Sequence, residues 1–503
     1  MAIELSTLTF TEQDDVVPAS GVEKIFNTGI TNTLAGDDII NGESGNGSHD
    51  AGVPPPHGGV FNTGTLNTDG GNDRLTGVFN DQSNIPFQAY GIYNREGIID
   101  TGDGNDILTG IVNSLIYLPK VSGIYNVEGI IDTGDGDDTI ISNSNVPNSS
   151  SIIYGIYNES STLKTGNGND IISGTANSIG ITFLSSTLDT GNGNDTINGT
   201  GDAGISSFGS TFNTSDGNDV ISGVGIYIGL LNSSLINTGE GDDIITGITA
   251  TVGTSGIHNY KTPESPYSAI IDTGNGNDTI AGSGVSLGII NGDTIYTGNG
   301  NDSIISHGSF FNTSGVFLGN GNDSITADTG FSDRALENYN AIETGDGNDI
   351  ITTTGVIYNE GIINTGNGDD SIIVDGGIDD ITGTTYGIYN NGGAINMGDG
   401  NDSIIANEGF ESAENSSGAW FLGEGDDYIL GYGSGDFYGG NGNDTLELTP
   451  GTYTVGIWGE GGESPIFTKG DQLMITSEFE KLKAGSTIYD FTSLTAGQII
   501  VVA

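Results

Sequence analysis

Thr133-Gly134-Asp135-Gly136-Asp137-Asp138-Thr139-Ile140 is the stretch of sequence that decides this fold. Close copies of it recur between Thr33 and Leu446. With the eight positions numbered from the threonine, all 16 copies have Gly fourth, Asn or Asp fifth, Asp sixth and Ile or Leu eighth. A carboxylate-bearing glycine turn that is repeated this faithfully predicts a row of metal sites in a repeat protein.

The candidate ligands follow from the chemistry of calcium, a hard cation that takes about six to eight oxygens from carboxylates and backbone carbonyls. Gly at the second and fourth positions permits φ > 0 and turns carbonyls inward, while the sixth position supplies the carboxylate. The sixth-position candidates are Asp38, Asp73, Asp106, Asp138, Asp170, Asp195, Asp219, Asp243, Asp278, Asp302, Asp323, Asp349, Asp370, Asp402, Asp427 and Asp444. The remaining candidates are the third-position Asp103 and Asp135 and the fourth-position Gly104, Gly136, Gly168 and Gly193.

The net charge points to the same cation. The 503 residues include 66 acidic and 10 basic ones, which gives a net charge of −56. Self-repulsion of that size opposes a compact state, and stacked turns would place their aspartates face to face. One ion between each pair of successive turns gives up to about 15 calcium ions. We therefore expect calcium as the cofactor and expect folding to depend on it.

Composition also excludes several classes of function. Nucleic acids and anionic membrane surfaces require Lys and Arg, which are scarce here, so neither is an expected partner. Cys is absent, which excludes disulfides, thiolate zinc sites and cysteine nucleophiles. No run of about 18 apolar residues is present, so we expect no membrane insertion. Glycine accounts for 87 residues, but without the Gly-X-Y period of collagen.

The spacing of the motif predicts an all-β fold. From Asp73 to Asp427, successive sixth-position aspartates lie 21 to 35 residues apart. In each interval a triplet such as Ile124-Tyr125-Asn126 comes first, then a short apolar segment, then the turn, then a further apolar segment. This order reads as strand, corner, strand, turn, strand, with no helical period. It predicts a parallel β-solenoid (β-helix) with one calcium-binding glycine turn per coil of about 21–35 residues, capped at both ends.

The recurring Ile-Tyr-Asn triplets carry two further expectations. We expect the tyrosines to stack as core aromatics, with an exposed sugar-stacking platform as the alternative. We expect the asparagines either to form a ladder from coil to coil or to adopt the αL conformation at a corner. The triplets are Ile92–Asn94, Ile124–Asn126, Ile156–Asn158, Ile357–Asn359 and Ile388–Asn390.

Three segments are predicted along the chain. Residues 1–24 lack the motif and are expected to form an N-terminal cap, residues 25–450 the solenoid, and residues 451–503 a C-terminal cap. In that last segment, Met474–Thr476 and Ile499–Val502 read as strands and Glu478–Leu482 as a turn or short helix. Loop insertions rich in turn-forming residues are expected at Glu43–Gly59, Asn143–Ser151 and Tyr260–Ser268.

The motif resembles the hemolysin-type (RTX) calcium-binding repeat, Gly-Gly-x-Gly-x-Asp-x-apolar-x. Gly102–Leu108 and Gly193–Ile197 match it closely, and the resemblance covers residues 33–450. The tail, with Phe479–Leu482 and Tyr489–Gly497, is similar to C-terminal segments of cyanobacterial RTX-type proteins. Two departures exist: the first Gly is Thr in 12 copies, and the turns are not in nine-residue tandem. A wider coil with a single calcium row is therefore expected in place of the two-rowed β-roll.

The resemblance implies secretion by a type I (ABC-transporter) system, with the signal in the last residues, Gln498–Ala503, and with folding triggered by calcium outside the cell. No N-terminal signal peptide is visible, as that route implies. We expect a secreted, extracellular structural protein of a bacterial cell surface: a subunit of a surface layer, sheath or fibril that associates with itself. The expected partners are calcium, the type I secretion machinery, other copies of the chain and a surface polysaccharide.

Two alternatives remain for the function. One is an adhesin or an ice- or carbohydrate-binding rod, in which the first-position threonines would form an outward ladder. These are Thr101, Thr133, Thr165, Thr190, Thr238 and Thr273. The other is a β-helix polysaccharide lyase or epimerase, which would need a base and a cluster of cations. The basic residues are scattered, so we expect no enzyme activity.

Overall fold

The computed structural model describes residues 2–19, 21, 23–44, 57–80, 88–114, 120–147, 151–251, 254–261, 268–330, 333–379, 383–412, 418–459 and 464–503. Two 3₁₀ turns, η1 (Leu5–Thr7) and η2 (Phe491–Ser493), are the only helical elements among these residues, and all other regular structure is β-strand. Within these ranges no helix has the length and apolar character needed to cross a bilayer.

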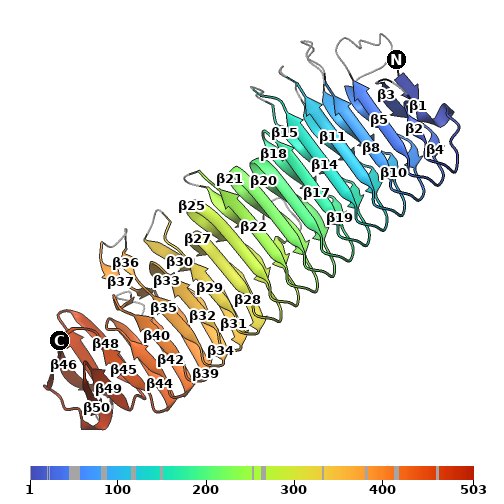
Figure 1. The fold of residues 1–503 in the computed structure, drawn as a ribbon. Coiled ribbons are helices and arrows are strands. Elements are labelled where there is room, and N and C mark those ends of the chain that lie inside the picture. Colours follow the sequence, from blue (N-terminus) through green and yellow to red (C-terminus); the bar gives the residue numbers. More distant parts are fainter. Residues whose placement is uncertain are drawn as a thin grey trace. The chain divides into compact units, whose positions relative to one another are not determined.

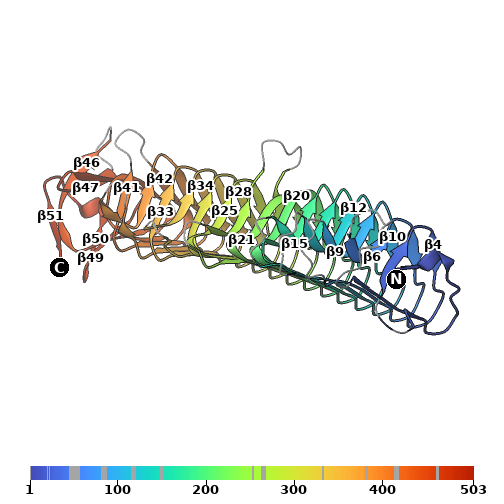
Figure 2. The same cartoon turned by 90° about the horizontal axis from the view of Figure 1, so that it is seen from above.

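The chain divides into two compact units, Met1–Thr251 with Gly256–Gly274, and Val252–Ser255 with Asn275–Ala503. Each is built from short parallel strands that stack coil upon coil (Figures 1 and 2). The all-β, parallel β-helix predicted from the sequence is thereby confirmed.

One coil of the first unit shows the construction. Strand β12 (Val121–Val127) is followed by a corner, β13 (Ile130–Asp132), the glycine turn and β14 (Thr139–Asn145). Each strand pairs in parallel with its equivalent one coil later, with Ile124 opposite Ile156 and Ile140 opposite Ile172. The backbone is thus satisfied between coils, and the predicted order of strand, corner, strand, turn, strand is confirmed.

The first unit contains three stacks of such strands. Its strands are β1 (Ala2–Glu4), β2 (Val16–Val17), β3 (Lys24–Asn27), β4 (Ile30–Asn32), β5 (Ile39–Ser44), β6 (His57–Asn62), β7 (Thr65–Asn67), β8 (Arg74–Phe79), β9 (Ala89–Arg95), β10 (Ile98–Asp100), β11 (Ile107–Asn113), β12 to β14, β15 (Ile153–Glu159), β16 (Thr162–Lys164), β17 (Ile171–Ala176), β18 (Ile179–Leu184), β19 (Thr187–Asp189), β20 (Thr196–Asn213), β21 (Val220–Asn237), β22 (Ile244–Thr249) and β24 (Ile270–Asp272). β23 (Ser255–Asn259) begins at the unit boundary.

The second unit repeats the pattern and ends in antiparallel strands. Its strands are β25 (Thr279–Asn291), β26 (Thr294–Tyr296), β27 (Ser303–Asn312), β28 (Gly315–Asn320), β29 (Ser324–Ala327), β30 (Arg334–Asn338), β31 (Ala341–Asp346), β32 (Ile350–Thr353), β33 (Val356–Asn359), β34 (Ile362–Asn367), β35 (Ser371–Val374), β36 (Gly377–Ile378), β37 (Thr385–Tyr386), β38 (Ile388–Asn390), β39 (Ala394–Asp399), β40 (Ser403–Ala406), β41 (Phe410–Ser412), β42 (Ala419–Gly425), β43 (Tyr428–Leu430), β44 (Gly435–Gly442), β45 (Thr445–Leu448), β46 (Gly451–Trp458), β47 (Ser464–Lys469), β48 (Gln472–Ser477), β49 (Lys481–Ala484), β50 (Thr487–Asp490) and β51 (Ile499–Val502).

The interior of each coil is narrow and filled by side chains from all three strands. Ile124, Ile131 and Ile140 are each no more than 1% exposed. The eighth-position residue is buried in every copy of the motif, so the predicted role of that residue as an anchor is confirmed. Burying such side chains stabilises the coil by about 25 cal/mol per Å² of apolar surface removed from water.

The triplet asparagines form a ladder inside the coils. Asn94 Nδ2 donates to Oδ1 of Asn126 at 2.8 Å, and Asn126 Nδ2 donates to Oδ1 of Asn158 at 2.7 Å. The ladder alternative is therefore confirmed and the αL alternative is wrong. The αL residue of the corner comes two positions later, as at Glu96 (φ 56°) and Glu128 (φ 54°).

The triplet tyrosines stack outside the coil but are covered. Tyr93, Tyr125 and Tyr157 are only 6%, 8% and 7% exposed. Their ring centroids are 5.3 Å apart along the stack and their planes are nearly parallel. Lys120 Nζ lies 4.5 Å from the centroid of the Tyr125 ring and donates to its hydroxyl at 2.9 Å. The prediction of stacked, buried aromatics is confirmed for these three triplets, whereas Tyr389 is only partly buried and its ring lies at 83° to that of Tyr358.

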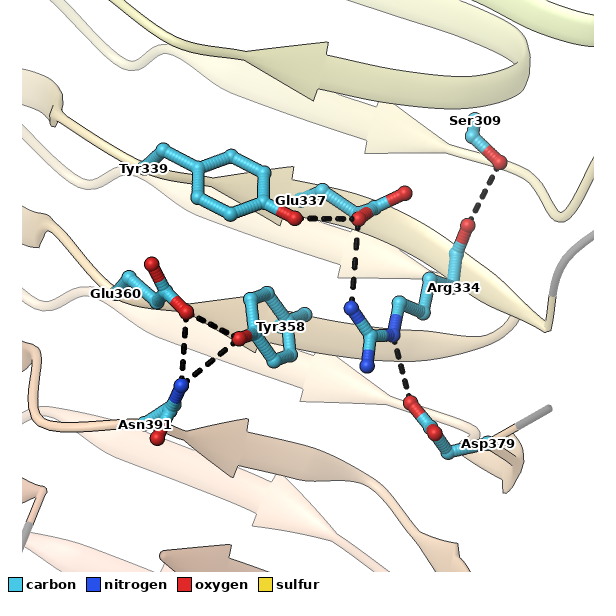
Figure 3. Close-up of polar contacts among 8 residues, drawn as sticks. All are labelled: Ser309, Arg334, Glu337, Tyr339, Tyr358, Glu360, Asp379 and Asn391. Atoms are coloured by element: carbon cyan, nitrogen blue, oxygen red, sulfur yellow. Dashed lines mark hydrogen bonds and ion pairs between the residues drawn. The ribbon is translucent and has the colours of Figure 1, made fainter. Parts of the chain in front are cut away.

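In the second unit a buried cation covers the equivalent aromatic. The Arg334 guanidinium lies 3.8 Å from the centroid of the Tyr358 ring, and its Nε donates to Oδ2 of the fully buried Asp379 at 2.6 Å (Figure 3). Asp379 follows β36, which pairs antiparallel with β37. The ion pair therefore fastens this short hairpin, an insertion between coils, onto the β-helix.

The N-terminal segment is an incomplete coil. β1 pairs in parallel with β3, and β2 pairs in parallel with β5. Lys24, which the sequence assigned to the cap, is the first residue of β3 and belongs to the stack.

The C-terminal segment combines parallel and antiparallel pairing. β48 and β49 pair in parallel with β44 and β45, whereas β46, β47, β50 and β51 pair antiparallel. The predicted strands at 474–476 and 499–502 are confirmed. In Glu478–Leu482 the helix alternative is wrong, because Glu478 has φ 60° and Lys481 begins β49.

The predicted insertions lie largely beyond the described residues. Their centres, 45–56, 148–150 and 262–267, are among the residues that the structure does not describe. Two of the three begin later than expected, because Glu43 and Ser44 belong to β5 and Asn143–Asn145 belongs to β14. His57–Gly59 begins β6.

Candidate metal centre

The glycines make each turn possible because nothing larger fits. Gly134 and Gly136 have φ of 80° and 147°. A Cβ on Gly136 would lie 1.8 Å from the carbonyl oxygen of Gly104 in the preceding coil. The same approach recurs through the turns, so the second- and fourth-position carbonyl oxygens each pack against the glycine of the next coil. The predicted need for glycine is confirmed at the fourth position, whereas the second position needs φ > 0 and is Leu34, Asp69 or Ser215 in three copies.

The sixth-position aspartates are buried in all 16 copies, with exposures of 0% to 2%. They do not form a solvated acidic face. Within each unit their backbones and carboxylates make a ladder, since the N–H of one Asp donates to Oδ1 of the next. Asp106 N–H donates to Asp138 at 2.7 Å, and Asp138 N–H donates to Asp170 at 2.7 Å.

The second carboxylate oxygen of 14 of these aspartates accepts no hydrogen bond. Within the described part of the chain, the buried Oδ2 atoms accept no hydrogen bond in Asp38, Asp73, Asp106, Asp138, Asp170, Asp195, Asp219, Asp302, Asp323, Asp349, Asp370, Asp402, Asp427 and Asp444. Leaving one buried charged oxygen unsatisfied is costly. Repeating it at this many equivalent places indicates that the row is built for a ligand that supplies positive charge.

The first-position threonines lie on the same inner side of the turn. Thr101 and Thr133 are 1% and 0% exposed. Thr68 Oγ1 donates to the carbonyl of Thr101 at 3.1 Å, and the Thr68 hydroxyl also holds down the pKa of Asp73. An outward threonine ladder, as an ice-binding rod would need, is therefore contradicted at this position.

Burial raises the pKa of the sixth-position aspartates. Desolvation raises the pKa of Asp138 to about 8, even though the Thr133 hydroxyl and the hydrogen bond from the backbone N–H of Asp106 lower it. Desolvation likewise raises the pKa of Asp106 and Asp170 to about 7. Neighbouring carboxylates of the same row add to the rise. These side chains therefore resist ionising at neutral pH unless a cation compensates.

The third- and fifth-position residues face the solvent. Asp135 and Asp137 are exposed, and each accepts hydrogen bonds from the backbone and side-chain amides of an asparagine in the next coil, which lower their pKa. Asp103 is exposed as well. The two third-position candidates thus lie in a different environment from the buried carboxylates.

The row fits an oxygen-coordinated cation in which the backbone supplies most ligands. Among the described residues, no three His, Cys, Asp or Glu side chains come together as a metal-ligating group. Each turn offers one buried carboxylate, with that of the neighbouring coil beside it, and glycine carbonyls at the second and fourth positions. A hard divalent cation accepts this mixture of carboxylate and carbonyl oxygens.

Sequence reasoning missed one turn at each end of the row. At the N-terminal end, Asp15 N–H donates to Oδ1 of Asp38 at 2.7 Å, as a sixth-position Asp would. At the C-terminal end, Asp444 N–H donates to Oε2 of Glu480 at 2.8 Å. Neither segment has the fourth-position Gly. What remains of the motif in each segment is an acidic residue two positions before an apolar one: Asp15 before Val17, and Glu480 before Leu482.

A shallow groove of about 300 Å³ runs along the outside of three turns. It is lined by Asp103, Asp132, Asp135, Lys164, Asn167 and Asp189, together with glycines. Lys164 is the one cationic side chain of this lining.

Comparison with known proteins adds little. No protein-family model matches the chain, and no curated protein matches it. One solved structure that matches is described as "X-ray crystal structure of a hyperactive, Ca2+-dependent, beta-helical antifreeze protein from an Antarctic bacterium". It is 17% identical, with 80% of this chain and 82% of that chain covered and a TM-score of 0.27.

Proposed function

We propose that this chain is a secreted, calcium-dependent structural protein of a bacterial cell surface. The observation that carries the proposal is the row of buried aspartates whose Oδ2 atoms accept no hydrogen bond. Calcium ions between successive turns would satisfy those oxygens and offset the net charge of −56. Sixth-position aspartates such as Asp106, Asp138 and Asp170 would hold the ions with glycine carbonyls. The chain acts as a scaffold, with no catalytic role.

Counting bound ions tests the metal row. Native mass spectrometry of the full chain in calcium should show a cooperative series ending at about 15 ions. Far-ultraviolet circular dichroism should show loss of strand signal in a chelator at pH 8. Magnesium at the same concentration is the control, because it demands a small octahedral site and dehydrates reluctantly. A chain that binds only one or two ions would rule out the row.

We also propose that the chain associates with itself in calcium. Two features support this: the solvent side of the turns carries exposed carboxylates such as Asp135 and Asp137, which a divalent cation would bridge between molecules, and the C-terminal cap ends in edge strands. Each of β50 and β51 pairs with one neighbour among the described residues, and Ile488 and Val501 are 64% and 68% exposed. Exposed apolar edges of this kind favour pairing with another chain. Electron microscopy with calcium and then a chelator should show layers or fibrils that dissolve, whereas monodisperse particles at high calcium would contradict assembly.

Type I secretion remains part of the proposal. Its signal would lie in Gln498–Ala503, most of which forms β51 in the folded cap. Such a segment is available to an exporter only while the chain is unfolded, which low calcium inside the cell ensures. In a host that carries a type I exporter, deleting residues 498–503 should keep the chain inside the cell. Normal export of the truncated chain would contradict the route.

A second candidate is a protein that adheres to an ordered surface such as ice or a crystalline polysaccharide. The outward side chains of the third strand in each coil form columns in register, with Thr139 opposite Ile171 and Ile141 opposite Ser173. Ile141 and Ile171 are 40% and 44% exposed. This face carries little charge in a strongly acidic chain. Retention on ice or on chitin or cellulose, lost after Ile141→Lys, would support this candidate over assembly.

A further inference from the structure

The ladder of aspartates has a direction, and the direction makes its two ends different. Each N–H donates toward the C-terminal end, and each carboxylate accepts from the coil before it. At the first turn the cap needs to supply only an N–H, which Asp15 provides. At the last turn Asp444 still has an N–H to donate, so the C-terminal cap must supply an acceptor. Glu480 does so at 2.8 Å.

Glu480 occupies the place of a sixth-position aspartate. Lys481 N–H donates to the carbonyl of Asp444 at 2.9 Å, as the seventh-position residue does in the repeats. Leu482 is opposite Leu446 and fully buried, which is the environment of the eighth position. The cap thus reproduces the hydrogen bonds of the turn with a sequence that lacks the motif, although Glu480 is exposed where the sixth-position aspartates are buried.

Two oxygens of this last turn lie close to Gly439. Asp444 is fully buried, and its Oδ2 is among those that accept no hydrogen bond. A Cβ on Gly439 would lie 2.8 Å from that oxygen and 2.0 Å from the carbonyl oxygen of Glu478. Both oxygens therefore line the same small space beside Gly439. The first position, Thr in 12 copies, is Gly only here, which is what admits the Glu478 carbonyl.

We propose that Asp444, Glu480 and the Glu478 carbonyl form a terminal site for a divalent cation, which docks the C-terminal cap (β46 to β51) onto the last coil. It rests on the proposed calcium row and adds one ion whose ligands come from two segments. Because Glu478 and Glu480 lie outside the repeats, the site forms only when the cap is in place. Calcium then stabilises the closed end of the β-helix as well as the coils.

The variant Glu480→Gln distinguishes two roles for Glu480: a ligand of a cation, or only a hydrogen-bond acceptor for the Asp444 N–H. The amide oxygen of Gln still accepts the Asp444 N–H, but the charge is lost. For the full-length variant in calcium, native mass spectrometry should count one ion fewer than wild type. Hydrogen exchange should show that protection of the cap amides falls about tenfold, as expected for losing a ligand present at ten times its dissociation constant. Asp471→Asn, an exposed change in the same cap, should alter neither.

The outcomes are distinguishable. A wild-type chain that binds no calcium would overturn the proposed function itself. A wild type with a full row and a Glu480→Gln variant with the same count and the same cap protection would overturn the terminal site alone. Should Glu480→Gln fail to fold, Gly439→Ala tests the terminal site instead. The new Cβ would lie 2.0 Å from the Glu478 carbonyl oxygen and would therefore push that oxygen out of the site. Loss of one ion in that variant supports the site, and an unchanged count contradicts it.

Discussion

The backbone N–H of Asp106 donates to Oδ1 of Asp138, 32 residues later in the chain, at 2.7 Å. This contact commits one oxygen of each buried carboxylate to the neighbouring coil and leaves the other without a hydrogen bond. It also means that the spacing of the carboxylates is fixed by the β-helix itself. A cation that enters the row therefore meets oxygens that are already in position.

The metal-free chain should become less stable as the pH rises. The folded pKa of Asp106 and Asp138 is raised to about 7 and about 8 from 3.8. Between pH 3.8 and these raised pKa values, the folded chain binds more protons than the unfolded chain. The protonated carboxyls therefore stabilise the folded state fully below pH 3.8, and this stabilisation is lost as the pH rises through about 7. Circular dichroism in chelator should show more strand at pH 5 than at pH 8. Calcium should abolish the difference.

Equal strand content at both values, without calcium, would contradict this prediction. A low pH also relieves repulsion among the exposed carboxylates. To separate that effect from protonation of the buried aspartates, the pH 8 measurement is repeated in about 1 M salt, which screens exposed charges strongly but buried charges little. Salt alone should not restore the strand signal.

Asp138→Asn should have opposite consequences in metal-free and in calcium-bound protein. The buried Asn removes a charge that burial disfavours, so we expect the metal-free chain to gain about 1–3 kcal/mol at pH 8. In calcium the same variant should bind one or two ions fewer. The exposed Asp137 is the control, with changes below about 0.5 kcal/mol. Urea unfolding with and without chelator measures both, and a metal-free loss of stability in Asp138→Asn would count against the idea.

Gly136→Ala should prevent close stacking of two turns. Its Cβ would lie 1.8 Å from the Gly104 carbonyl, and its φ is 147°. We expect a loss of at least about 3 kcal/mol in the free energy of unfolding in calcium. Gly70→Ala, at the third position of another turn, is the matched control because its nearest neighbour atom would be 3.6 Å away. Similar denaturation midpoints for the two variants would refute the steric argument.

Asn126→Ala should interrupt the asparagine ladder. Asn126 donates to Oδ1 of Asn158 at 2.7 Å and to the Thr162 carbonyl at 3.0 Å, and it accepts from Asn94. Removing it leaves buried polar groups unsatisfied, at an expected cost of about 2–4 kcal/mol. Asn143→Ala on an exposed side of β14 should change stability by less than about 0.5 kcal/mol. Thermal unfolding in excess calcium compares them, and equal shifts would show that the ladder contributes little.

Arg334→Met should destabilise the second unit. The change breaks the ion pair between Arg334 and Asp379 and leaves the fully buried Asp379 carboxylate without its cation. Breaking a buried pair in this way costs about 3–5 kcal/mol. Arg95→Met is the control, because the pair of Arg95 with Glu96 is more than half exposed and such pairs contribute about 0–1 kcal/mol. Hydrogen exchange of β36 and β37 reports the local effect, and unchanged exchange there would contradict it.

Much of the fold could be predicted from local patterns. The glycine positions, the eighth-position anchors and the order of strands in a coil each follow from backbone sterics and from the period of apolar residues. The turns at Asp15 and Glu480 could not, because they keep the hydrogen bonds of the motif without its glycines. The αL corner at Glu96 was missed for a similar reason, since a non-glycine residue with φ 56° has no sequence signal.

The sequence by itself determined a parallel β-helix with one carboxylate turn per coil, because glycine, aspartate and an apolar residue at fixed spacing leave few other conformations. Only the tertiary structure decided which carboxylates are candidates for the metal. Stacking buries Asp138 and exposes Asp135 and Asp137, although all three are acidic neighbours in one turn. The physical reason is desolvation: burial by the neighbouring coils, not sequence, raises the pKa of Asp138 and leaves one of its oxygens to be satisfied by a cation.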